Sequence, residues 1–204
     1  MPQSRAAGAP QSAARERRTL SERVLHAAGA TFARDGVTLV PPFWLDVCAG
    51  ERASLALRDA RAAKVAARMV AGIVKTTCGT LLVCDFDPRI QPVQAKRLAG
   101  FVPAQRDCAP CGDAGAAIDL QAALFEVPRK PARQRVDAVL AALGTRDAAG
   151  FAVALALVRP IKLLVLDRPS PEFEARVAQM LDAGTALVCT GVGVDAPAAI
   201  LAAR

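Results

Sequence analysis

The sequence is poor in aromatic residues, which make up 4% of its 204 residues, and it contains no tyrosine. Proteins that bind single-stranded nucleic acid stack bases on aromatic side chains, and this chain offers few of them. Its formal net charge is +7, and the first twenty residues carry +3 of it through four arginines and one glutamate. The remaining charge is typical of an ordinary basic surface. We therefore expect no nucleic-acid partner.

Long hydrophobic runs are also missing. No apolar stretch approaches the roughly twenty residues that a membrane-spanning helix needs, and the N-terminus lacks the apolar segment of a secretory signal. We therefore expect a cytoplasmic protein. A chain of 204 residues that is 53% hydrophobic is long enough for one sizeable core. We predict a flexible basic tail at 1–22 and a single domain at 23–204.

Histidine occurs once, as His26, so metal ligands would have to come mainly from the six cysteines. Cys108 and Cys111 have the spacing of a redox pair or of half a zinc site. No second close pair completes a set of four ligands, and two ordinary thiols are the favoured interpretation. Without an export signal we expect the thiols to be reduced. We expect no metal site. A redox or zinc-binding scaffold built around Cys108 and Cys111 is the weakest of the three functional hypotheses; the other two follow below.

Strands and helices alternate along most of the chain, which favours an α/β domain with a mostly parallel sheet. The hydrophobic patterns predict strands at 28–32, 43–47, 53–57, 80–84, 100–102, 163–166 and 186–189. They predict helices at 60–71, 118–125, 131–143, 148–158, 172–182 and 197–204. The segment KLLVLDRPSP (162–171) is notable because an apolar strand ends at Asp167, where a carboxylate would face a ligand crevice.

From about residue 27 to the C-terminus, the order of these elements resembles an ABC transporter ATPase, a P-loop NTPase-like nucleotide-binding domain. The segments that carry the resemblance are AGERASLAL (49–57), MVAGIVKTTCGTLLVCDFDPR (69–89), RLAGFVPAQ (97–105), ALVRPIKLLVLDRP (156–169) and GTALVCTG (184–191). The resemblance implies antiparallel N-terminal strands beside a mostly parallel central sheet. It also implies a helical subdomain at about 106–158, shorter than is usual in the family.

The phosphate loop of the family is not preserved. An ungapped count places LRDARAAKV (57–65) at the glycine-rich loop, and none of the glycines is present. A phosphate-binding loop needs converging backbone amides, which side chains obstruct. The same count puts Ala63 at the phosphate-binding lysine and Lys64 at the magnesium-binding hydroxyl. A shift of one residue would return Lys64 to the first role.

The other catalytic positions depart from the family as well. LGTR (143–146) stands at the signature loop, Ala104 and Gln105 at the glutamine loop, and Gly191 at the switch histidine. The adenine-stacking aromatic residue falls near Arg34, with Phe32 two residues away. The metal-associated carboxylate Asp167 is kept, but Arg168 follows it where the family has an acid that orients water. Arginine cannot accept a proton in a protein, so it cannot do that work.

These departures together predict a catalytically inactive member of the family, with no catalytic residues and no cofactor. Its expected role is structural or regulatory, as a subunit that docks to a transmembrane permease or to other subunits of a bacterial complex. Membrane association would be peripheral and through the partner, at the inner face. The alternative is a divergent ATP-binding protein that still energises transport and holds ATP and magnesium through Lys64 and Asp167.

Two basic groups have no assigned role. Arg61, Lys64 and Arg68 form one stripe at helical spacing, and Arg129, Lys130, Arg133 and Arg135 form a second group in the predicted helical subdomain. A solvated surface is the default interpretation of each. The second group is also a candidate for docking to the membrane partner.

Overall fold

A computed structural model describes residues 23–108, 112–193 and 200–203 of the chain. One of the two sheets has three antiparallel strands in the order β2-β1-β4. Its strands are β1 (Arg23–Arg34), β2 (Val37–Cys48) and β4 (Cys78–Val83). Asp35 and Gly36 join β1 to β2, and both have positive φ, as the tight turn of a hairpin requires. This sheet contains the antiparallel N-terminal strands that the sequence predicts.

The second sheet has five strands in the order β5-β6-β7-β3-β8. Its members are β3 (Arg52–Leu57), β5 (Ala99–Val102), β6 (Leu163–Asp167), β7 (Ala186–Val192) and β8 (Ile200–Ala203). The first four run parallel, and β8 pairs antiparallel with β3. Every residue of β6 is buried, which explains the uninterrupted apolar run of this central strand.

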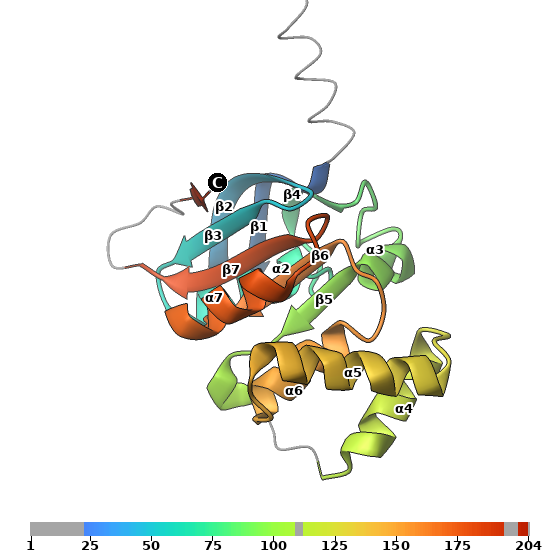
Figure 1. Cartoon of the computed structure of the whole chain (residues 1–204). Helices are drawn as coiled ribbons and strands as arrows, with labels where there is room; N and C mark the ends of the chain where they lie inside the picture. Colours follow the sequence, from blue (N-terminus) through green and yellow to red (C-terminus); the bar gives the residue numbers. More distant parts are fainter. Residues whose placement is uncertain (1–22, 109–111, 194–199, 204) are drawn as a thin grey trace, which may run out of the picture.

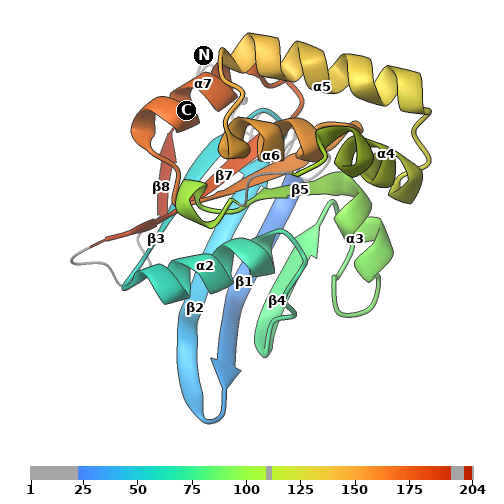
Figure 2. The same cartoon turned by 90° about the horizontal axis from the view of Figure 1, so that it is seen from below.

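Helix α2 (Ala60–Val70) packs between the two sheets, as Figures 1 and 2 show. Its buried face is made largely of alanines and Met69, and small side chains let the helix lie close to both sheets. The first core of the molecule surrounds this helix. The bounds of β3 and α2 follow the predicted ranges 53–57 and 60–71 closely, whereas β1 and β2 extend well beyond the predicted 28–32 and 43–47.

Three helices form a separate lobe beside β5: α4 (Ala114–Leu124), α5 (Arg129–Leu143) and α6 (Ala148–Ala156). With α7 (Pro171–Met180), they enclose a second core that covers the other face of β6 and β7. The buried residues Val136, Val153 and Phe173 lie in this core. The parallel sheet is therefore covered by helices on both faces, as parallel sheets require.

Two further elements differ from the sequence prediction in type or presence. The helix predicted at 197–204 is wrong, because Ile200–Ala203 is strand β8 and pairs with β3. The alanine-rich composition favours a helix locally, and a free sheet edge overrides it. Helix α3 (Pro92–Leu98) was not predicted; only Ala95 in it is buried, so the segment has no apolar period to detect.

None of the helices in the described part of the chain is long and apolar enough to cross a membrane.

Candidate functional site

The connection from β3 to α2 is only two residues long, Arg58 and Asp59. A P-loop has at least six residues between strand and helix, and its amides wrap around a phosphate. Here the chain passes directly from the sheet into the helix. Of the segment that the ungapped count placed at the phosphate loop, most belongs to α2: Ala63 is fully buried, whereas Lys64 is only partly buried.

Asp59 caps the first turn of α2. Its Oδ1 atom accepts a hydrogen bond of 2.8 Å from the backbone N–H of Ala62. This bond is the main reason why the pKa of Asp59 lies below the usual value for aspartate, and Arg58 lowers it further. A helix N-terminus attracts anions through its free amides and its dipole. At α2 that position is taken by a carboxylate of the chain itself, which would repel a phosphate.

Asp167 lies at the end of β6 with its side chain fully buried, and both of its oxygens bond to the next residue. The Arg168 guanidinium donates from Nε to Oδ1 at 2.8 Å and from Nη2 to Oδ2 at 3.1 Å. The backbone of Arg168 has a φ of 47°, a conformation that non-glycine residues rarely adopt. The Arg168 N–H also bonds to the Thr190 carbonyl at 3.0 Å. A divalent cation would therefore have to compete with this guanidinium for the same carboxylate.

Arg168 is also the centre of a chain of ion pairs. Its Nη2 lies 3.4 Å from Oδ2 of Asp107, and the same oxygen accepts a hydrogen bond of 2.9 Å from Nζ of Lys64. Lys64, first, and Arg168 hold the pKa of Asp107 below its usual value, and the bond to Asp167 is the main reason why the pKa of Arg168 is raised. The structure thus brings Lys64 and Asp167 into one site, linked by Asp107 and Arg168. Both cations are paired with carboxylates of the chain itself, Arg168 with Asp167 and Asp107 and Lys64 with Asp107.

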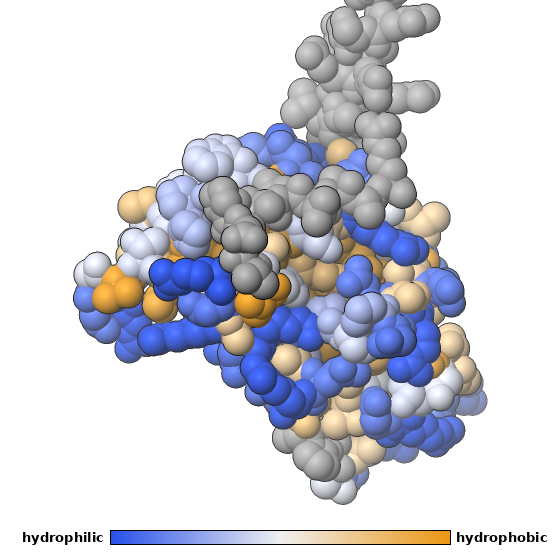
Figure 3. Space-filling view, turned by 90° about the vertical axis from the view of Figure 1, so that its left-hand side faces the viewer, coloured by the Kyte–Doolittle hydropathy of each residue, from blue (hydrophilic) through white to orange (hydrophobic). Residues whose placement is uncertain are grey.

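A cavity of about 430 Å³ borders this ionic chain. Its walls are Ala60, Ala104, Gln105, Arg106, Arg168 and Val192. The two predicted glutamine-loop residues therefore lie beside Arg168, and Gly191 at the switch-histidine position precedes Val192 at the end of β7. Figure 3 looks onto the side toward which β3 and β5 point in Figure 1, and hydrophilic side chains dominate it.

The predicted signature position, residues 143–146, forms the turn between α5 and α6. Gly144 ends α5 in the left-handed conformation, with φ 63°. Asp147 then caps α6, and its Oδ1 accepts a hydrogen bond of 2.7 Å from the N–H of Gly150. Both helices at the predicted phosphate-binding positions, α2 and α6, therefore begin with an aspartate that accepts a hydrogen bond from one amide of the first turn.

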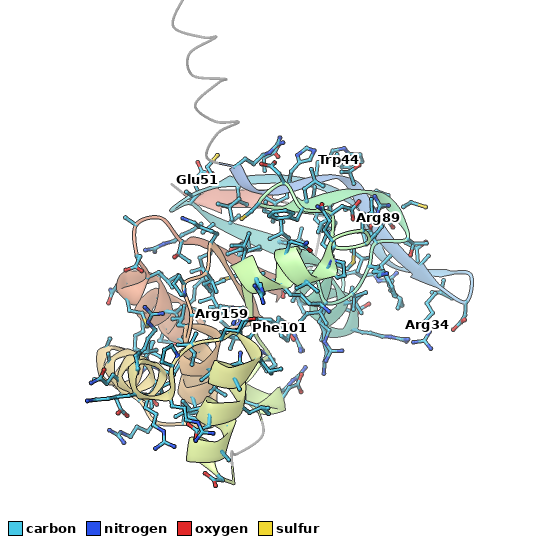
Figure 4. All side chains as sticks on the ribbon, turned by 90° about the vertical axis from the view of Figure 1, so that its right-hand side faces the viewer. Arg34, Trp44, Glu51, Arg89, Phe101 and Arg159 are labelled. Atoms are coloured by element: carbon cyan, nitrogen blue, oxygen red, sulfur yellow. The ribbon has the colours of Figure 1, made fainter. Side chains whose placement is uncertain are left out.

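Other predicted candidates lie elsewhere. Arg34 stands at the tip of the β1–β2 hairpin, exposed and paired with Asp35 (Figure 4). Cys108 is partly buried, with Sγ 3.6 Å from the Pro103 carbonyl oxygen, and Cys111 lies outside the described residues. Among the residues described, no group of three or more His, Cys, Asp or Glu side chains could hold a metal ion.

The sequence interpretation missed two residues of the site. Asp59 could have been found, since an aspartate immediately before an alanine-rich helix is a capping signal. Asp107 carried no such signal: it lies 43 residues from Lys64 and 61 from Arg168 in sequence, and only the fold brings the three together.

Comparison with solved structures identifies the fold. CbiO1 from Clostridium perfringens, part of the ABC transporter complex CbiONQ, superimposes with a TM-score of 0.66 at 16% identity; the match covers 85% of this chain and 80% of CbiO1. An ATP-binding subunit of an ABC transporter gives a TM-score of 0.65 at 11% identity, covering 83% and 79%. No family model and no curated protein matches the sequence. The predicted fold, an ABC ATPase cassette, is confirmed.

Proposed function

We propose that this chain is a catalytically inactive ABC-ATPase-like subunit with a structural or regulatory role. It would act in the cytoplasm, at the inner face of the membrane, by docking to a transmembrane permease or to other subunits of a bacterial complex. The observation that carries the proposal is the bidentate bond between Arg168 and Asp167. It occupies the carboxylate with an internal cation, at a position where hydrolysis needs a base or a water-orienting acid.

The fit of magnesium and ATP to these residues is poor for two independent reasons. A magnesium ion would have to displace the guanidinium from the buried Asp167 carboxylate, at the cost of leaving Arg168 without its closest partner. The triphosphate would approach the amides of α2 against the charge of Asp59. The residues present therefore do not fit a magnesium–nucleotide complex, and we derive no reaction step through one.

The capping of α6 extends this argument to a second surface. In ABC cassettes, as the resemblance implies, each ATP lies between the phosphate loop of one subunit and the signature loop of the other. Asp59 and Asp147 would place a carboxylate at both kinds of surface. Such a chain would impair both sites of a head-to-tail dimer, which favours a scaffold over half of an ATP-driven pair.

A groove on the opposite side from the ionic chain supports docking. A cavity of about 380 Å³ lies between α2, β5, α4 and α6, lined by the apolar Ile73, Phe101, Phe125 and Leu155 and by the cations Lys96 and Arg159. Ile73 is 46% exposed, and Leu124 on α4 is 62% exposed. Figure 4 shows Phe101 between the sheet and the helical lobe. An apolar floor with a basic rim suits an apolar partner segment that carries carboxylates.

Calorimetry with ATP and magnesium tests the proposal. We expect no detectable heat of binding at millimolar nucleotide for the purified chain, with an intact ABC ATP-binding subunit as the positive control. Micromolar, magnesium-dependent binding that Lys64→Ala or Asp167→Ala abolishes would overturn it and support the alternative, a divergent ATP-binding protein.

Docking is tested separately, by crosslinking. A photocrosslinker at Ile73, but not at Val37, which is even more exposed, should label an integral membrane protein.

A further inference from the structure

A second cavity of about 430 Å³ lies at the amino end of the parallel strands, away from the ionic chain. It is bordered by the residues that precede β5, β6 and β7, namely Leu98, Lys162 and Thr185, and by α5 and the end of α7. The apolar side chains in its wall are Leu98, Val139, Leu157, Ile161, Met180 and Leu181. Its volume and mainly apolar lining are those of a small-molecule pocket, for which about 300–1,000 Å³ is usual.

The charged side chains of this cavity are unbalanced. Arg135, Arg159 and Lys162 line it against a single acid, Asp182. Among the residues that the structure describes, none of these three cations lies within ion-pair distance of a carboxylate. Arg135 gives one hydrogen bond, from Nη1 to the Val158 carbonyl at 3.1 Å, and retains other donors. The cavity therefore presents excess positive charge to whatever enters it.

Arg159 is the most constrained of the three. It is 8% exposed and donates to the backbone carbonyls of Lys96, Arg97 and Ala99 at 2.8, 3.1 and 2.8 Å. These bonds use Nε and Nη2, and its guanidinium carbon lies 3.4 Å from the centre of the Phe125 ring. Burial lowers the pKa of Arg159 to about 10. A buried guanidinium that bonds to carbonyls and lacks a carboxylate gains from an anion nearby.

We propose that this cavity binds a small amphipathic carboxylate, with the hydrocarbon part against Leu98, Leu157 and Met180 and the carboxylate near Arg135 and Lys162. The geometry selects this class over two others. A neutral apolar molecule would leave the cations unused, and an amine would meet three like charges. The inference does not depend on the ionic chain, because the cavity shares no residue with it or with the cavity beside Arg168. It shares Arg159 with the docking groove between α2, β5, α4 and α6.

Binding of octanoate to the full chain, compared with n-octanol and octylammonium, tests the inference. Calorimetry is the measurement, with octanoate and octylammonium below their micellar concentrations and octanol below its solubility limit. We expect octanoate to bind at least about tenfold more tightly than octanol, as a charge-assisted bond implies, and octylammonium to show no binding. Equal affinity for octanoate and octanol, or no binding of octanoate, would overturn the proposal.

A pair of variants with equal net charge separates the site from general attraction. Arg135→Gln with Lys162→Gln should weaken octanoate binding about tenfold or more and leave octanol unchanged. The matched control is Arg61→Gln with Lys75→Gln, two exposed cations outside the cavity. If both double variants lower the affinity for octanoate equally, the attraction is non-specific and the proposed binding site is wrong.

The location can be read from methionine methyl groups, because the chain has only three methionines. Met180 lines the cavity, whereas Met69 lies fully buried in the other core. With ¹³C-methyl methionine, assigned through Met180→Leu, octanoate should shift the Met180 signal and leave that of Met69 in place. A shift of Met69 without Met180 would place the ligand elsewhere and contradict the proposal.

Discussion

The two ends of the parallel sheet treat positive charge in opposite ways. At the carboxyl end, Lys64 and Arg168 are both paired with carboxylates, those of Asp107 and Asp167. At the amino end, Arg159 is more deeply buried than Arg168, yet only backbone carbonyls and an aromatic ring compensate it. At the first end the cations are neutralised by internal ion pairs, whereas at the second the described residues include no carboxylate within ion-pair distance of Arg135, Arg159 or Lys162.

This contrast shows that a cleft can lose its capacity to bind a charged ligand through internal ion pairs, without any loss of volume. A cavity of about 430 Å³ persists beside Arg168, but the groups that would bind a cation or a phosphate there are already bonded to one another. Volume and position alone would assign the site to a nucleotide. The pairing of its charges argues for the opposite conclusion.

The largest effect on stability should come from the amino end. Arg159→Ala would leave three carbonyls at the α3–β5 junction without their donor and remove the contact with Phe125. An unsatisfied buried acceptor costs about 1–3 kcal/mol, so we expect a loss of about 3 kcal/mol in the free energy of unfolding. Urea denaturation measures it, with exposed Arg61→Ala as control. Similar losses in both variants would show that the three bonds of Arg159 do not stabilise the fold.

At the carboxyl end, a double-mutant cycle measures the pair that closes the site. Asp167→Ala should destabilise the chain by about 2 kcal/mol, because it leaves the mostly buried Arg168 without its closest partner. In the double variant with Arg168→Ala, we expect a coupling energy of about 1–2 kcal/mol between the two changes. Denaturant unfolding of the four proteins gives this value. Additive effects would mean that the two side chains are not paired in solution.

The smallest of the three effects concerns the α2 cap. Asp59→Ala should cost about 1 kcal/mol at pH 7, and Asp59→Asn less, because asparagine also caps helices. The folded-state pKa of Asp59 is lowered, so its stabilisation is present above the unfolded pKa and is lost as pH falls through the folded value. The gap between wild type and Asp59→Ala should therefore shrink from pH 7 to pH 3. A gap independent of pH would contradict a charged cap.

Much of the site was predictable where the pattern is local. The buried run 163–166 predicts β6, and its last residue Asp167 is the carboxylate at the crevice. Arg168 is also apparent from the sequence, as a basic residue at the position where the resemblance implies an acidic one. The short connection at Arg58 and Asp59 was not predicted. An alignment without gaps assumes a phosphate loop of full length, and the chain has only two residues between β3 and α2. The helix at 197–204 failed because pairing with β3 outweighs alanine propensity.

The sequence by itself determined most of the alternation of strands and helices, without α3 and β8, and it showed the loss of glycines at the phosphate loop and the arginine after Asp167. These depend on periodicity and residue type, which neighbouring residues fix. Only the tertiary structure decided what Arg168 does: a carboxylate 61 residues away and a lysine beyond it complete the ionic chain. It also decided that Arg159 would be buried without an acid. Such pairings depend on contacts between distant segments, and no local pattern encodes which partners the fold brings together.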